Sequence, residues 1–214
     1  MLIDIISDVV CPWCYVGKRR LEAALAARPD LSVEIAWHAF QLNPGMPEEG
    51  MDRENYLATK FGGADRAASI YSDIEQAGAT EGIEFAFDAI KRTPNTINAH
   101  RLILLAGRHG VQDAVVELLF RRYFLAGVDV GDIQQLIAIA TEAGLDEAAT
   151  RYYLESDEGV EEVTSEDRQM RHIGVTGVPC FIIDKRFAIS GAQAPEVFQR
   201  IFDTAVAAEE EAAE

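Results

Sequence analysis

Two cysteines, Cys11 and Cys14, stand with Pro12 and Trp13 between them, shortly after the apolar run Leu2–Ser7. A nearly continuous apolar run of this length is typical of a strand buried on both faces, and a proline suits the first turn of a helix. A strand that ends in C-x-x-C and continues as a helix is typical of a dithiol redox site. The helix N-terminus stabilises a thiolate, and the spacing places the second sulfur within disulfide reach. The motif therefore predicts an α/β fold whose first strand and helix present a redox-active cysteine pair.

The elements that follow the motif predict a sheet interrupted by a block of helices. Residues 11–27 have helical spacing, and residues 31–40 alternate in polarity as a strand does, so the order is strand, helix, strand. This order implies a parallel pair with a right-handed crossover. From about residue 53 to residue 156 the periodicity is helical, and no strand is predicted. Helices within this block are predicted over residues 95–109, 112–125, 132–143 and 146–155.

The last part of the chain is predicted to return to the sheet. An amphipathic helix is expected over residues 157–173. Two short strands, Cys180–Ile183 and Phe187–Ser190, then predict a hairpin with a tight turn at residues 184–186. Residues 195–208 predict a final helix.

The composition excludes several classes of protein. The chain of 214 residues is 49% hydrophobic, which is ample for a core, but no apolar run approaches the roughly 20 residues of a membrane helix. The net charge of −17 argues against a nucleic-acid partner, because phosphate binding needs clustered Lys and Arg. Met1 leads directly into the strand pattern without a signal peptide, and three cysteines are too few for a disulfide scaffold, so we expect a cytoplasmic protein if Met1 is the native start. The acidic end, residues 205–214, is expected to fray.

Four stretches of the chain resemble segments of one known family. They are SDVVCPWCYVG at 7–17, FQLNP at 40–44, NAHRL at 98–102 and GVTGVP at 174–179. On these stretches the chain resembles the DsbA family, and within it the FrnE-like cytoplasmic branch. The resemblance implies a thioredoxin fold, a central mixed sheet flanked by helices, with a large all-helical insertion. Residues 1–45 plus 157–214 would form the thioredoxin-like domain, and residues 46–156 the inserted helical domain.

The resemblance also implies a dithiol-disulfide oxidoreductase or isomerase, in which a cis Val178–Pro179 bond lies beside the cysteines. Periplasmic DsbA has a signal peptide and a His where this chain has Trp13, so a strongly oxidising export catalyst is not expected. The same superfamily contains glutathione-dependent isomerases and kappa-class glutathione transferases, which commonly carry a serine at the position of Cys11. The presence of both Cys11 and Cys14 argues against that branch and leaves glutathione open as a redox partner.

Three residues are predicted to be catalytic. Cys11 is the candidate nucleophile, and Cys14, one turn further along the helix, is the resolving thiol that releases the reduced substrate. Pro179 in cis would expose the backbone of Val178 to an extended substrate strand. The alternatives for the cysteines are a metal half-site or two core thiols, but the sequence offers no second C-x-x-C or paired His, so no metal is expected. The alternative for Pro179 is an ordinary proline that opens a strand.

The candidate substrate-binding residues are Pro12, Trp13, Val178 and His100. Trp13 would stack on the substrate or on glutathione, or would only pack against the insertion. His100 lies on a helix that the family places near the active site. There it would carry protons for the leaving thiolate, or serve as a packed histidine.

Other side chains have both a structural and a functional interpretation. Cys180 follows Pro179 in a strand, and is either a small buried hydrophobe or a third redox thiol. The basic residues 18–20 form a solvated helix face, or they attract anionic glutathione. His38 on the second strand is expected to be structural.

These features predict a cytoplasmic thiol-disulfide oxidoreductase or isomerase that works through a mixed disulfide on Cys11. Its partners would be protein or small-molecule thiols and disulfides, with glutathione as a redox co-substrate or a thioredoxin-type reductant, and no cofactor is required. In the cytosol, reduction or isomerisation is favoured over net oxidation. Two other functions stay open. One is a glutathione-dependent isomerase or kappa-class-like glutathione transferase that acts on small aromatic compounds, and the other is a chaperone-like module that holds unfolded chains.

Overall fold

The computed structural model describes residues 1–213, with side chains over residues 1–63 and 66–211. In chain order the elements are β1 (Leu2–Ser7), α1 (Pro12–Ala26), β2 (Glu34–Ala39), β3 (Met51–Asp52), α2 (Arg53–Phe61), α3 (Ala64–Thr80), the short helix η1 (Phe87–Ala89), β4 (Arg92–Thr93), α4 (Ile97–Arg108), α5 (Gln112–Ala126), α6 (Ile133–Glu142), α7 (Glu147–Glu155), α8 (Val160–His172), β5 (Cys180–Ile183), β6 (Phe187–Ser190) and α9 (Pro195–Ala213).

The central sheet has four strands in the order β2-β1-β5-β6. β1 pairs in parallel with β2, where Ile5 lies opposite Trp37, and antiparallel with β5, where Ile5 lies opposite Phe181. β5 and β6 form the predicted hairpin, whose turn has positive φ at Asp184 and Lys185. Two successive residues of this kind match a type I′ turn, whose twist follows that of the strands. The predicted parallel pair, hairpin and mixed sheet are therefore confirmed.

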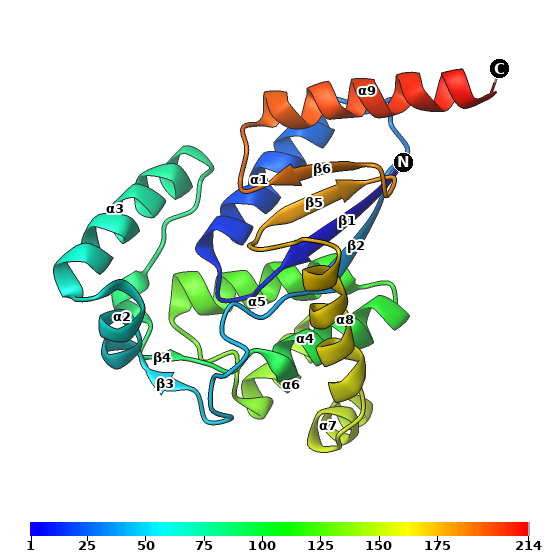
Figure 1. Cartoon of the computed structure of the whole chain (residues 1–214). Helices are drawn as coiled ribbons and strands as arrows, with labels where there is room; N and C mark the ends of the chain where they lie inside the picture. The colour runs from blue at the N-terminus through cyan, green and yellow to red at the C-terminus, as the bar shows by residue number, and fades with distance from the viewer. Residues whose placement is uncertain (214) are drawn as a thin grey trace.

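Helices cover both faces of this sheet (Figure 1). On one face, Phe181 of β5 contacts Phe198 of α9 edge to face, with 4.9 Å between the ring centroids. On the other face, Ile6 and Cys180 cluster with hydrophobic side chains that include Met170 of α8. Successive side chains of a strand point to opposite faces, so β5 contributes to both layers. The expected central sheet flanked by helices is confirmed.

The helices between β2 and α8 share one hydrophobic core with the sheet. Tyr15 of α1 stacks on Phe120 of α5, with 5.1 Å between the ring centroids, and Trp37 of β2 contacts the same phenylalanine edge to face. The side chain of Gln112 accepts from the Trp37 N–H at 2.9 Å and donates to the Trp37 carbonyl at 3.2 Å. These bonds pair backbone groups at the outer edge of β2, which would otherwise be open to another chain. They also hold α5 against β2.

Three elements differ from their predictions. β4 pairs with β3 in a two-stranded ribbon, within a block whose periodicity predicts helices alone, because two residues are too few to show an alternating pattern. The second strand covers Glu34–Ala39 rather than residues 31–40. α9 continues to Ala213 instead of fraying from residue 205, since its end consists mainly of Ala and Glu, which are strong helix formers. Residue 214 lies outside the described residues.

The large helical insertion is present, with α2 to α7 between β2 and α8. The domain limits, residues 1–45 plus 157–214 and residues 46–156, stay a prediction. Over the described residues, the structure contains no helix with the length and apolar character needed to cross a membrane.

Candidate functional site

The cysteine motif lies where β1 passes into α1. Cys11 is the N-cap residue of α1; its N–H donates to the Asp8 carbonyl at 3.0 Å, and its own carbonyl accepts from the Cys14 N–H at 3.0 Å. Cys11 is 5% exposed and Cys14 is 1% exposed, and both are free thiols. Cys11 therefore stands at the N-terminal end of α1, where the first N–H groups have no partner within the helix.

The Val178–Pro179 bond is cis, as the resemblance implies, and it lies against Cys11. The Sγ of Cys11 donates to the Val178 carbonyl oxygen at 3.5 Å. Gly17 permits this approach, because a Cβ at its position in α1 would stand 3.0 Å from the Pro179 ring. The Pro179 carbonyl accepts from the Gly191 N–H at 2.8 Å, whereas the Val178 N–H has no hydrogen-bond partner among the described residues. The tertiary structure thus brings Cys11, Val178 and Pro179 together. It leaves the Val178 N–H without a partner in the segment that contacts the Cys11 sulfur.

Cys14 is held in its protonated form. Burial raises the pKa of the Cys14 thiol well above its ordinary value, and the hydrogen bond and charge of Cys11 raise it further. The hydroxyl of Ser7 and the backbone of Asp8 act in the opposite direction without outweighing burial. Cys14 must therefore lose a proton before it can attack a disulfide.

Asp8 is a site residue that the sequence analysis does not single out. It is fully buried three residues before Cys11, and its Oδ2 accepts from the Leu42 N–H at 2.8 Å. Its Oδ1 lies 3.4 Å from the Nε2 of His100, which is 3% exposed. The two atoms are not aligned as a hydrogen bond, and neither has another hydrogen-bond partner among the described residues. A buried acid with an unsatisfied oxygen is costly, so it marks a functional site, and its signal in the sequence is a carboxylate just after an apolar strand.

The remaining candidates lie around this centre or away from it. Pro12 occupies the first turn of α1, and Trp13 is partly buried against the main core. Cys180 is buried on the face of β5 that packs against α8, where burial raises its pKa, in agreement with a small buried hydrophobe. In the part of the chain that the structure describes, no group of three or more His, Cys, Asp or Glu residues is placed to hold a metal ion.

The basic residues 18–20 of α1 form ion pairs rather than an anion site. Lys18 is 3% exposed and pairs with three carboxylates, one on α1 and two on α5. Arg19 shares two of these carboxylates, and Arg20 pairs with Glu81 at 2.7 Å. The interpretation of residues 18–20 as a solvated face is wrong for Lys18, which is buried, and acidic side chains pair with all three charges. The attraction of glutathione to these residues stays a prediction.

His38 of β2 ties α8 to the sheet. Its Nε2 lies 2.8 Å from Asp4 Oδ1, and its Nδ1 lies 2.7 Å from Glu166 Oε1. Burial opposes the charged imidazole, but the hydrogen bonds to Glu166 and Asp4 outweigh it and raise the pKa of His38 above its ordinary value. Burial also opposes the charge of Glu166, yet the bonds from His38 and from the Ala39 N–H lower the pKa of this carboxyl. The structural interpretation of His38 is confirmed.

Replacing His38 with Gln is expected to destabilise the fold by about 1–3 kcal/mol near pH 5.5, and by less at pH 8.5. Because the pKa of His38 is raised on folding, its contribution is complete below the unfolded value of about 6.5 and is lost as the pH rises through the folded pKa. Urea unfolding of both proteins at the two pH values measures the effect. His172→Gln, at an exposed position of α8, is the control. A difference between wild type and His38→Gln that stays constant with pH would contradict the prediction.

Comparisons with known proteins match nearly the whole chain. A model of the DSBA-like thioredoxin domain matches residues 2–203. The crystal structure of a probable DsbA oxidoreductase from Streptomyces coelicolor is 33% identical, with a TM-score of 0.89 over 97% of this chain and 90% of that one. The uncharacterized protein YwbO of Bacillus subtilis is 28% identical over 205 residues, which are 92% of this chain and 94% of that protein. The cytosolic disulfide reductase DsbM from Pseudomonas aeruginosa, solved with GSH, is similar in fold, with 15% identity and a TM-score of 0.68 over 96% of this chain and 99% of that one.

Proposed function

The chain belongs to the DSBA-like thioredoxin domain family, and on this premise we propose that it is a thiol-disulfide oxidoreductase whose redox pair is Cys11 and Cys14. The observation that carries the proposal is the contact between the Cys11 sulfur and the Val178 carbonyl, beside the cis Pro179 and one helical turn from Cys14. This arrangement supports an attacking thiol beside a backbone segment that can receive a partner, with a second thiol behind it.

In the reducing direction, the Cys11 thiolate attacks one sulfur of a substrate disulfide. A disulfide between Cys11 and the substrate forms, and the other substrate sulfur leaves as a thiolate. Cys14 then loses its proton and attacks the Cys11 sulfur, which forms the Cys11–Cys14 disulfide and releases the second substrate thiol. Two molecules of glutathione, or one thioredoxin-type dithiol, would return the pair to its reduced form and be oxidised in turn.

Asp8 and His100 would take up the proton that Cys14 loses. Burial keeps Cys14 protonated, so the resolving step needs a base within the protein. Asp8 lies three residues before Cys11, and its Oδ1 lies 3.4 Å from the Nε2 of His100, a side chain of the type most often used as a general base. His100 would thus carry protons, as the sequence analysis expects, and Asp8 would take part in the same proton transfer.

The backbone of Val178 would position the substrate. An extended segment next to the reacting disulfide would pair with its free N–H as an added strand, and Pro12 and Trp13 would border that segment. This mode suits protein disulfides as well as small thiols. The GSH present with the structural neighbour DsbM supports glutathione as a redox co-substrate, and a cytoplasmic location would favour the reducing direction.

Redox equilibration tests the proposal directly. The protein is incubated with defined ratios of reduced and oxidised glutathione, free thiols are alkylated, and the mass shift counts the reacted cysteines. We expect one reversible disulfide between Cys11 and Cys14. A potential near or below the cytosolic poise of roughly −220 to −260 mV would indicate a reductase, and a potential well above it a dithiol suited to isomerisation.

One outcome of that experiment would overturn the proposal. If a stable glutathione adduct forms on Cys11 and no internal disulfide appears at any ratio, the two cysteines are not a redox pair. A glutathione-dependent isomerase or transferase would then be the better assignment, since such chemistry does not need Cys14.

A further inference from the structure

One peptide unit, between Gln41 and Leu42, joins an arginine of α8 to the buried acid of the candidate site. Its N–H, which is that of Leu42, donates to Asp8 Oδ2 at 2.8 Å. Its carbonyl, which is that of Gln41, accepts from the Nη2 of Arg171. The carbonyl of one residue and the N–H of the next belong to the same planar amide. A guanidinium and a carboxylate are therefore linked through two hydrogen bonds and one amide.

Asp167 holds this arrangement in place from the same helix. It is 5% exposed and lies one turn before Arg171, whose Nε donates to Asp167 Oδ2 at 3.0 Å and whose Nη2 donates to Oδ1 at 3.1 Å. Asp167 Oδ1 also accepts from the Gln41 N–H at 2.8 Å. The guanidinium lies over the Phe40 ring, 4.0 Å from its centroid. The ion pair thus bonds to both polar groups of the Gln41 backbone, and the aromatic ring fixes the guanidinium.

The hydrogen bond from Leu42 bears directly on the form of the Asp8 side chain. Asp8 is fully buried, and among the described residues the Leu42 N–H is the one hydrogen-bond donor to its carboxylate. Burial opposes a charged carboxylate, whereas a hydrogen bond to the charged form favours it. A charge-assisted hydrogen bond to an amide carbonyl polarises the amide, so its N–H becomes a stronger donor. Arg171 therefore favours the unprotonated form of Asp8, which is the form that accepts a proton.

The titratable groups around Asp8 come from several elements. Cys11 and Cys14 of α1 bond to the Asp8 backbone, and the ring of His100 on α4 lies 3.4 Å from Asp8 Oδ1. Tyr56 of α2 is also in range, because burial raises its pKa and the charge of Asp8 raises it further. The guanidinium of α8, in contrast, keeps its charge throughout the physiological pH range, so its effect on Asp8 is constant.

We propose that Arg171 is a positioning residue for the resolving step, because it holds Asp8 ready to accept the Cys14 proton. This inference rests on the proposed function and deepens it. The proton of the Cys14 thiol passes to the pair of Asp8 and His100. The Cys14 thiolate attacks the Cys11 sulfur of the mixed disulfide, and the substrate leaves as a thiolate with the electron pair of the broken bond. Arg171 itself neither gains nor loses a proton.

Single-turnover kinetics with dithiobis(nitrobenzoate) separate the two steps of the reaction. Excess probe converts Cys11 to a mixed disulfide and releases one thionitrobenzoate, and Cys14 then resolves that disulfide and releases another. The absorbance of the product should show a fast phase that depends on the probe concentration and a slower phase that does not. Cys14→Ser should show the first phase alone. The rate constant of the second phase is measured between pH 5 and pH 9.

In R171M we expect the second phase to slow about threefold to tenfold below the midpoint of its acid limb and to keep its rate constant at high pH. The midpoint should move to higher pH by about half to one unit, because Asp8 without the guanidinium takes up a proton more readily. The first phase should change by less than about twofold. R171K keeps the charge but loses the planar pair of donors, so its midpoint should lie between those of wild type and R171M.

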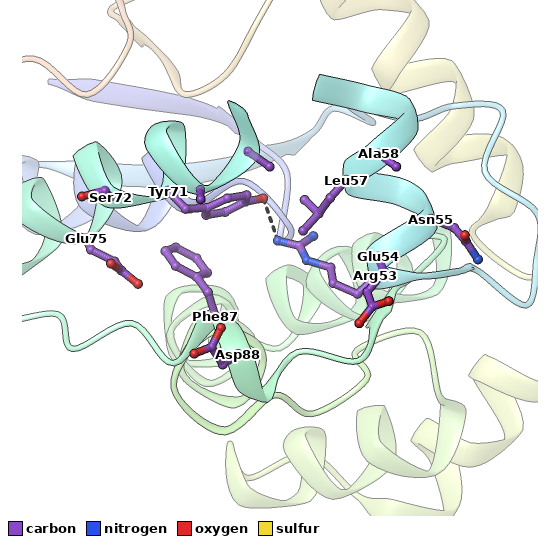
Figure 2. A pocket seen from close by; sticks show the side chains of 12 residues that line it. Arg53, Glu54, Asn55, Leu57, Ala58, Tyr71, Ser72, Glu75, Phe87 and Asp88 are labelled. Atoms are coloured by element: carbon purple, nitrogen blue, oxygen red, sulfur yellow. Dashed lines mark hydrogen bonds between the residues drawn. The ribbon is translucent and has the colours of Figure 1, made fainter. Parts of the chain in front are cut away.

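Two control variants separate this link from overall charge. R168M removes an exposed positive charge of α8, which pairs with Glu161. R53M removes a buried one: Arg53 lies beside a cavity of about 790 Å³ between α2 and α3, and Figure 2 shows it extending toward the hydroxyl of Tyr71. Among the described residues, no hydrogen bond joins either arginine to Asp8 or to residues 40–42. The midpoint in both controls should therefore stay within about 0.2 units of wild type.

An unchanged midpoint in R171M would overturn the inference. An equal shift in R168M or R53M would also overturn it, because the effect would then be one of overall charge, and so would equal slowing of both phases in R171M, because the effect would then lie on Cys11. Wild-type protein without a second phase would overturn the proposed function itself. If circular dichroism shows that R171M does not fold, the same shift is expected between D167N and D167N/R171M, in which no acid is left without its partner.

Discussion

Replacing Cys11 with Ser is expected to lower the turnover of disulfide substrates by a factor on the order of 10³ or more. The thiolate is the nucleophile of disulfide exchange, and a serine hydroxyl at the start of α1 neither ionises near neutral pH nor forms a disulfide with the substrate. Turnover is measured on a disulfide-bonded peptide with glutathione as the reductant. The remaining rate should equal that of the spontaneous exchange between peptide and glutathione.

Cys14→Ser separates the first step of the reaction from the second. Without glutathione, Cys11 still attacks the substrate but no second thiol resolves the product, so a mixed disulfide on Cys11 should accumulate and be visible by mass. Cys180→Ala is the matched control, because Cys180 is buried on the face of β5 that packs against α8, and turnover should not change. Full turnover in Cys11→Ser would show that Cys11 is not the nucleophile. Full turnover in Cys14→Ser would show that the reaction uses one cysteine and not a pair.

Replacing Arg101 with Met is expected to lower the free energy of unfolding by about 3–5 kcal/mol. Arg101 of α4 is 2% exposed, and its guanidinium donates to four backbone carbonyls at 2.5–3.1 Å, those of Tyr153, Leu154, Ser156 and Glu158. These carbonyls end α7 and begin the turn into α8. A methionine would remove this donor from all four carbonyls, of which that of Tyr153 would keep the Ser156 hydroxyl at 2.8 Å. The loss is costly because carbonyls at a helix end have no partner within the helix.

Chemical and thermal unfolding, followed by circular dichroism, measures the effect of Arg101→Met, and the Tm should fall by on the order of 10 °C. Arg108→Met is the control on the same helix. The Arg108 side chain is 42% exposed and pairs only with Glu158 and Glu162 in the described part of the chain, so its loss should cost less than about 1 kcal/mol. Equal losses in the two variants would show that the end of α7 does not depend on Arg101.

The secondary structure could be predicted wherever local residues decide it. Leu2–Ser7 is the observed strand, and the helices predicted to begin at residues 132 and 146 do begin there, capped by the side chains of Asp132 and Asp146. The ribbon of β3 and β4 could not be predicted, because Met51 and Thr93 are neighbours only in space. The extent of α9 could have been predicted from the helix propensity of its Ala and Glu residues, which outweighs the repulsion among its acids.

Of the candidate site, the pair Cys11 and Cys14 could be predicted from the sequence alone. The cis bond before Pro179 was accessible only through the family resemblance, since nothing local to Val178 requires it. Asp8 stands beside the motif and could have been noticed as a carboxylate that follows an apolar strand. Arg53 and Lys18 look like ordinary surface cations in the sequence, but both are buried.

The sequence by itself determined the cysteine motif on which the proposed redox chemistry rests, the order of strands and helices, and the large helical insertion. These follow from residue types at short spacing, because helix propensity, strand alternation and the C-x-x-C geometry act within a few residues. Only the tertiary structure decided which charges meet. In the folded protein, carboxylates of α5 pair with Lys18, and His100 lies beside Asp8. Arg53 is enclosed among neutral groups beside a cavity. The physical reason is that burial and the Coulomb interaction depend on distance through space and on exclusion of water, and segments far apart along the chain set both.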